Sequence, residues 1–249
     1  MLPRTGWGSQ PLWEQAGQKA TRHALLAALL AALASVPMLG NPLSLPDQVL
    51  IDDAAFLRQS NGVLASFLPR LAPPLPPDAE INPEYPAPLT RLLWWLEFRV
   101  FGAGRDGYKA ASLVLHALAA ALACLALARW TGSPALGLTG SLVLALHPST
   151  LPALLLRHQG TLLAAILTWA LLLVLGGERP RVTLAGVLAI AAVCAGPTGA
   201  AAAAVGLAWA LRTRAARGKE SAVLAGLVSL AVAGFLVSTA PYLRPRVPQ

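Results

Sequence analysis

Long apolar runs, separated by short polar or basic segments, cover most of the chain. A helix needs about 20 mostly apolar residues to cross the hydrocarbon core of a bilayer, and these runs approach or reach that length. They predict membrane spans at residues 24–39, 108–128, 134–156, 160–176 and 221–240. The pattern therefore predicts an all-α fold, a polytopic membrane helix bundle.

The first apolar run has two interpretations. The letters ALA at residues 32–34 have the small-x-small form of a signal-peptide cleavage site. However, the polar segment before the run is long and basic, which favours an uncleaved span at residues 23–39. Residues 1–22 are then a cytoplasmic N-terminal segment.

Residues 40–106 differ from the rest of the chain. They hold eight of the 11 acidic residues and the stretch LAPPLPPDAEINPEYPAP, which lacks too many backbone donors to form a helix or a central strand. Two pieces, residues 61–71 and 88–102, are amphipathic, and the second carries Trp94 and Trp95. We expect a large extracytoplasmic loop whose amphipathic helices lie in the membrane interface, where aromatic rings favour the headgroup layer.

The apolar run at residues 182–211 has basic residues on both flanks. Because basic flanks mark the cytoplasmic side, the chain has to cross and return within this run. The letters AGPTG at residues 195–199 divide it into two arms that are too short for full spans. We predict two short helices or a re-entrant hairpin, whose turn must be covered by neighbouring helices or a cavity. Together with the span at residues 23–39, the transmembrane bundle at residues 107–240 then gives about seven membrane segments, and residues 241–249 form an extracytoplasmic tail.

Composition and charge agree with this pattern. Hydrophobic residues make up 56% and charged residues 12% of the chain, against about 45–50% and about 25% in soluble domains. The net charge of +8 does not indicate nucleic-acid binding, because the arginines lie scattered at the ends of apolar runs without interleaved aromatics. Cys124 and Cys194 lie inside apolar runs and have neither metal-ligand nor disulfide-framework spacing. The charges therefore act as topology signals and the cysteines receive no role.

Asp52 and Asp53 are adjacent carboxylates inside the short apolar stretch QVLIDDAAFL. An ionised carboxylate can accept a proton as a general base or coordinate a hard cation. The residues alone favour a simpler interpretation, two solvated aspartates in an interfacial turn, because nothing in their spacing demands a metal.

Four short motifs follow one another in an order that resembles a known family. They are LIDDAAF at residues 50–56, YPAPLT at 85–90, GYKAASLVLH at 107–116 and LALHPS at 144–149. Their order and spacing resemble the GT-C superfamily of membrane glycosyltransferases, most closely the membrane module of the transmembrane and tetratricopeptide-containing O-mannosyltransferase-like proteins. The resemblance covers roughly residues 24–174 and implies a GT-C-like fold.

The resemblance implies an inverting glycosyltransferase that takes a sugar from a polyprenyl-phosphate-linked donor to an extracytoplasmic acceptor hydroxyl. Asp52 or Asp53 would then be the general base, or would hold a divalent metal such as Mg or Mn. A leaving lipid phosphate needs positive charge nearby. The candidates for binding it are Lys109, Arg157, His158 and His147.

Expected partners are membrane lipids, the lipid-linked sugar and a further membrane protein, but no nucleic acid. The expected location is the bacterial inner (plasma) membrane, with a cytoplasmic N-terminus. Arginine or lysine at the end of a span, however, often only reaches to the interface, and His116 or His147 often only satisfies a neighbouring helix.

A second hypothesis follows from departures from the family pattern. Ala87 stands where the family has arginine, Lys109 where it has histidine, and Pro152 where it has glutamate, while Pro197 and Thr198 replace a Lys-Glu pair. These losses favour a catalytically degenerate relative, a scaffold or accessory subunit that binds a lipid or a partner protein. A transporter is disfavoured, because no charged residue lies at the centre of a predicted span.

Overall fold

The computed structural model describes residues 12–40, 48, 51–52, 55–58, 87–147, 158–177, 181–209, 223 and 226. Within these ranges every regular element is helical, which confirms the all-α prediction for this part of the chain. The elements are α1 (Leu12–Leu39), α3 (Ala55–Arg58), α5 (Pro88–Phe101), α6 (Arg105–Thr131), α7 (Pro134–Leu146), α8 (Gln159–Leu175), α9 (Val182–Ala195), the 3-10 helix η4 (Pro197–Gly199) and a further helix at Ala200–Trp209.

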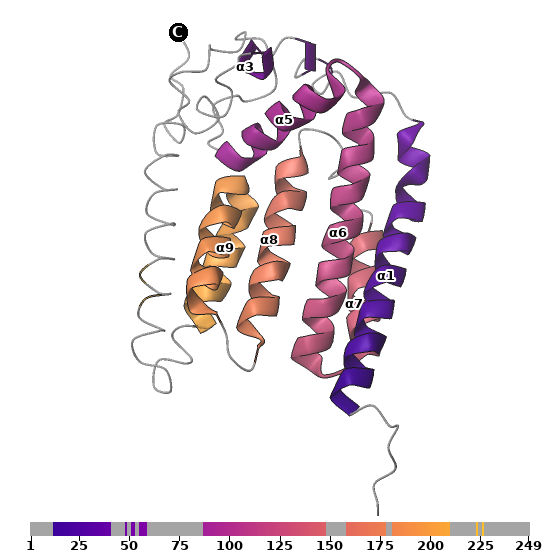
Figure 1. Cartoon of the computed structure of the whole chain (residues 1–249), viewed down its shortest axis with the longest axis vertical. Helices are drawn as coiled ribbons and strands as arrows, with labels where there is room; N and C mark the ends of the chain where they lie inside the picture. The colour runs from indigo at the N-terminus through magenta and orange to yellow at the C-terminus, as the bar shows by residue number, and fades with distance from the viewer. Residues whose placement is uncertain are drawn as a thin grey trace, which may run out of the picture.

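The long helices stand side by side and α5 lies across one end of them (Figure 1). We call this the α5 end; the opposite end holds Thr131 and the start of α1. Helix α6 is central, since it contacts α1 and α7 on one side and α8 on the other. Helix α5 contacts α6, α8 and α9, so it covers the end of that half of the bundle.

Small side chains line the contacts of α1 with α6 and α7. Ala24 and Ala27 of α1 pack on Cys124 of α6, and one turn further Ala31 packs with Ala120 and Ala145. Small residues allow helix backbones to approach closely, which is how helices pack where hydrophobic contrast is weak. Gly137 of α7 shows the closeness, because a Cβ atom there would lie 2.6 Å from the carbonyl oxygen of Cys124.

Residues 182–209 form two short helices, as the AGPTG turn predicts. Helix α9 ends at Ala195, Gly196 and η4 form the turn, and Ala202 and Ala203 of the returning helix share one buried core with α8 and α9. With 14 residues, α9 is about 21 Å long, short of the roughly 30 Å of a bilayer core. The hydroxyl of Thr90 in α5 donates to the carbonyl oxygen of Ala195 at 2.6 Å, so a neighbouring helix covers the turn.

At the opposite end, α6 connects to the C-terminus of α8. The Nε of Arg129 donates to the carbonyl oxygen of Gly176 at 2.8 Å, and the indole Nε1 of Trp130 donates to that of Leu172 at 2.9 Å. The bond from Arg129 supplies a donor to the carbonyl group of the residue that caps α8, and the guanidinium complements the helix dipole; the Leu172 carbonyl also accepts from the N–H of Gly176 at 2.9 Å. Gly132 then adopts a left-handed conformation (φ 69°, ψ 7°) that ends α6 before α7 begins.

Two helices are long and apolar enough to cross a membrane, Gly17–Pro37 and Arg105–Thr131. The shorter apolar helices are Pro134–Leu146, Gln159–Leu175, Val182–Ala195 and Ala200–Trp209. Helix α1 begins at Leu12, so part of the predicted N-terminal polar segment is helical. The predicted helix at residues 61–71 lies outside the described residues, and so does the predicted span at 221–240 except for Val223 and Gly226.

Candidate functional site

Asp52 lies at the α5 end, beside the start of α6. Its Oδ2 lies 3.3 Å from an Nη of Arg105, and both side chains are about half exposed (49% and 48%). The guanidinium of Arg58, in α3, donates to the backbone carbonyl of Asp52 and lies 3.5 Å from that of Ile51. Arg105 therefore connects this segment to α6, and Arg58 connects it to α3.

Lys109 lies one helical turn after Arg105. Its Nζ donates to the carbonyl oxygen of Leu39 at 2.8 Å and lies 3.8 Å from the carboxylate of Asp106. The first bond connects the C-terminus of α1 to α6. Of the predicted site residues, Asp52 and Lys109 thus lie at the same end of the bundle, both next to the start of α6.

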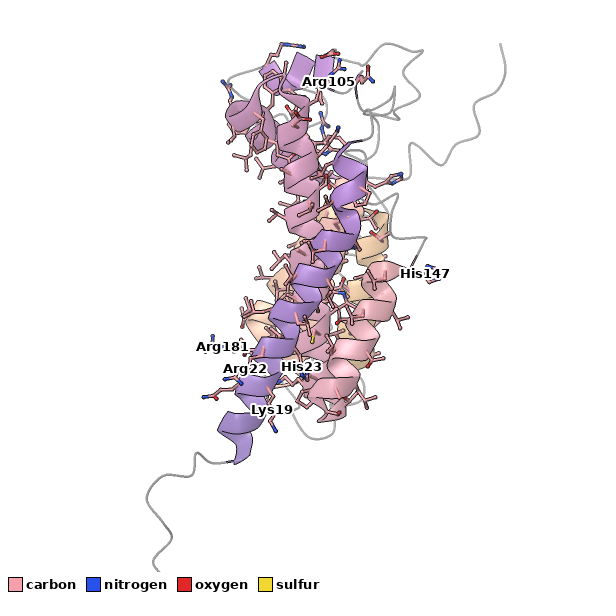
Figure 2. The ribbon with its side chains drawn as sticks, turned by 90° about the vertical axis from the view of Figure 1, so that its right-hand side faces the viewer. Lys19, Arg22, His23, Arg105, His147 and Arg181 are labelled. Atoms are coloured by element: carbon pink, nitrogen blue, oxygen red, sulfur yellow. The ribbon has the colours of Figure 1, made fainter. Side chains whose placement is uncertain are left out.

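The other predicted site residues are less closely grouped. His158 is the residue that precedes α8, and its side chain does not cap that helix. His147 follows α7 in an extended conformation (φ −64°, ψ 133°), as expected before proline, and lies far along the molecule from Arg105 (Figure 2). Asp53 and Arg157 lie outside the described residues.

The described residues do not form a divalent-metal site around Asp52. They contain no group of three or more His, Cys, Asp or Glu side chains that could hold a metal. The carboxylate of Asp52 is already beside the positive guanidinium of Arg105, which would repel a cation.

His116 is buried between helices. One ring nitrogen, Nε2, lies 3.2 Å from the carbonyl oxygen of Ala145 near the end of α7. Such a bond satisfies a carbonyl group at a helix end. This is the structural role that the sequence leaves open for His116.

A buried polar cluster joins α5, α6 and α8. The Nε2 atom of Gln159 faces the Oε1 of Glu97 at 3.1 Å, the Oγ of Ser112 at 2.9 Å and the carbonyl oxygen of Tyr108 at 3.4 Å. The side chains of Glu97 and Gln159 are 4% and 0% exposed. Burial raises the pKa of Glu97 to about 7, although the hydrogen bond from Gln159 lowers it.

Sequence reasoning missed this cluster because it places residues 88–102 in the membrane interface and gives Glu97 no partner in the bundle. In the structure the polar side of α5 faces the bundle: Thr90, Arg91 and Glu97 are buried, whereas Leu96 and Val100 are 48% and 74% exposed. One signal was present in the sequence. Gln159 is an amide that opens an otherwise apolar run, and a buried amide needs polar partners on a neighbouring element.

Compared with protein-family models, curated proteins and solved structures, the chain has no significant match. The GT-C resemblance therefore stays a prediction from four motifs. The geometry at the α5 end is the structural observation that bears on function.

Proposed function

We propose that the chain is an integral protein of a bacterial inner (plasma) membrane, with its N-terminus in the cytoplasm. Support comes from apolar side chains that α1, α6 and α7 expose, since Leu25, Val114 and Val143 are each more than half exposed. Covering such surface is worth about 25 cal/mol per Å2, and lipid supplies the cover. Lys19 and Arg22 gather at the end opposite Arg105 (Figure 2), which agrees with a cytoplasmic side marked by basic residues.

We further propose that the protein is a GT-C-like glycosyltransferase. It transfers a sugar from a polyprenyl-phosphate-linked donor to an acceptor hydroxyl at the extracytoplasmic face. The observation that supports this most is the ion pair between Asp52 and Arg105, with Lys109 one turn further along α6. A half-exposed carboxylate and two cationic groups therefore lie together at one end of the bundle.

In this mechanism Asp52 accepts the proton of the acceptor hydroxyl as its oxygen attacks the anomeric carbon. The bond between that carbon and the phosphate oxygen breaks, and the lipid phosphate leaves with the electron pair. Arg105 and Lys109 stabilise the developing phosphate charge. The half-exposed position of Asp52 leaves it accessible to an acceptor.

The test uses the full chain in lipid nanodiscs, radiolabelled polyprenyl-phosphate mannose and a Ser/Thr-containing peptide. Asp52→Asn is expected to lower transfer at least about 100-fold, because positioned base catalysis contributes on that scale. Asp106→Asn is the matched control, since Asp106 lies at the same helix start with its side chain 99% exposed. If the wild type transfers sugar and the Asp52→Asn variant still does so, Asp52 is not the general base.

A second candidate function is that of a non-catalytic scaffold or accessory subunit. It is favoured by how the polar groups at this end are used: Asp52 and Lys109 both hold neighbouring segments in place, through Arg105 and through the Leu39 carbonyl. In that case the wild type transfers no sugar and copurifies with another membrane protein at fixed stoichiometry. Arg105→Gln is then expected to release that partner protein. If the chain is an enzyme instead, the purified variant should contain the same proteins as the purified wild type.

A further inference from the structure

The cluster at the α5, α6 and α8 junction contains two buried oxygens that lack a donor. The amide nitrogen of Gln159 has two N–H groups, which are shared among three acceptors on Glu97, Ser112 and Tyr108. The remaining oxygens, Oε2 of Glu97 and Oε1 of Gln159, are fully buried and find no hydrogen-bond partner among the residues that the structure describes. Both are acceptors, so the junction is short of a hydrogen-bond donor.

A proton on Glu97 would supply that donor. It removes a charge whose burial is costly, and it turns one carboxyl oxygen into an O–H group. A proton also needs no cavity, whereas a hard metal ion needs about six oxygen ligands. The described residues offer no group of three or more His, Cys, Asp or Glu for a metal, so a proton fits this site better.

We propose that Glu97, with Gln159 and Ser112, forms a proton-binding site that holds α5 on the bundle, so that loss of the proton weakens this contact. The site uses none of Asp52, Arg105 and Lys109, so the proposal does not depend on sugar transfer. Its effect extends to the hairpin at residues 182–209, because Thr90 on the same helix donates to the Ala195 carbonyl at the turn. Proton binding thus regulates how firmly α5 covers that turn.

The surroundings of Glu97 favour the protonated form. Burial raises its pKa from the ordinary 4.5 to about 7, and the Gln159 bond lowers it by less than burial raises it. Tyr108 of α6 is the titratable group that interacts with Glu97 directly, and an ordinary phenol is neutral below pH of about 10. The other charged or titratable side chains of the elements packed here are Arg58 in α3, Arg91 and Arg99 in α5, Arg105, Asp106 and Lys109 near the start of α6, His116, Cys124 and Arg129 further along α6, His158 before α8, and Cys194 in α9.

The direction of the pH effect follows from the raised pKa. Between pH 4.5 and about 7 the docked state keeps its proton, whereas the detached state has lost it. The contribution to docking is therefore fully present below pH 4.5, falls as the pH rises, and is lost above about 7. A single proton changes the docking equilibrium by at most about tenfold per pH unit in this window.

The test is infrared spectroscopy of the full chain in nanodiscs, which detects the C=O stretch of a protonated carboxyl. We expect a band that titrates with a midpoint near pH 7, is absent in Glu97→Gln, and persists in Asp106→Asn, where the exposed carboxyl is removed instead. Gln159→Leu tests the assignment of this band to Glu97 in a second way, because it leaves Glu97 in place. Since the amide bond lowers the pKa of Glu97, its loss should move the midpoint to higher pH.

Hydrogen exchange of the backbone amides of α5 measures whether loss of the proton weakens the contact of this helix with the bundle. Relative to Glu97→Gln at the same pH, protection of residues 88–101 in the wild type should fall by up to about tenfold per pH unit between 4.5 and about 7. The proposal is overturned if the wild type shows no such infrared band, or if the band is unchanged in Glu97→Gln. Equal protection of α5 in the wild type and in Glu97→Gln at every pH would also overturn it. A midpoint that moves when choline replaces Na+ would also overturn it, because the occupant would then be a metal cation.

Discussion

The two sides of α6 are held by different kinds of contact. Towards α1 and α7 the contact consists mainly of small apolar side chains, such as Ala27, Ala31 and Ala120, with little room for change, although His116 also bonds to the Ala145 carbonyl of α7. Towards α5 and α8 it depends on a few polar groups around Gln159. The first kind is sensitive to volume. The second tolerates volume better but responds to protonation and to the loss of one donor.

The largest expected effect tests the small-residue side. Gly137→Ala should lower the free energy of unfolding by about 2–3 kcal/mol, because its Cβ would lie 2.6 Å from the Cys124 carbonyl oxygen and 2.7 Å from the Cβ of Ala128. Denaturation in mixed micelles measures this. Gly140→Ala, three residues on, would meet only the flexible end of Leu127 and should cost much less. Equal losses from the two variants would show that close packing does not hold this side.

The next effect tests the polar side. Gln159→Leu removes the donor that serves Glu97, Ser112 and Tyr108, and should cost about 1–3 kcal/mol of unfolding free energy. Thr168→Val on the same helix is the control, because that hydroxyl bonds only to the Ala164 carbonyl of its own helix. Thermal unfolding distinguishes them, and a Gln159→Leu protein as stable as the control would rule out a stabilising role for the amide.

A smaller effect is expected where α5 meets the hairpin. Thr90→Val keeps the shape of the side chain but loses the 2.6 Å bond to the Ala195 carbonyl, at a cost of about 1 kcal/mol. Thr90→Ser keeps the hydroxyl and serves as control. Faster hydrogen exchange at residues 196–203 in the valine variant alone is the expected readout. Unchanged exchange would show that α5 does not stabilise the turn.

The smallest effect concerns the exposed end of α6. Arg129→Gln loses the bond to the Gly176 carbonyl and a favourable charge at the C-terminus of α8, together about 0.3–1 kcal/mol at low salt. Salt screens such charges, so the difference from wild type should shrink as ionic strength rises. A loss that does not change with salt would assign the effect to the hydrogen bond rather than to the charge.

Much of the helix order follows from the sequence, because apolar runs and turn letters carry local information. The AGPTG turn predicts the break between α9 and the helix that follows it, and residues 160–176 match α8 within a residue at each end. Boundaries set by tertiary contacts were less predictable. Helix α1 begins at Leu12, well before the apolar run, where polar residues continue the helix.

The candidate site could be predicted only in part. The contact between Asp52 and Arg105 could not be predicted. It depends on where the predicted loop at residues 40–106 returns to the helices, and no local sequence pattern contains that information. The orientation of α5 could not be predicted, since an amphipathic pattern shows that two faces differ but does not say which faces the protein. In the structure Leu96 and Val100 are exposed while Glu97 is buried against the bundle.

The contacts between α6 and α8 also constrain how the molecule can move. Gln159 and Ser112 join the two helices near one end, and Arg129 and Trp130 join them near the other. A helix pair held at one end can pivot, but a pair held at both ends behaves as a stationary frame. Helix α5 lies outside this frame and joins it through a three-residue connection, Gly102–Gly104, so its position depends on the polar contacts it makes with α8 and α9.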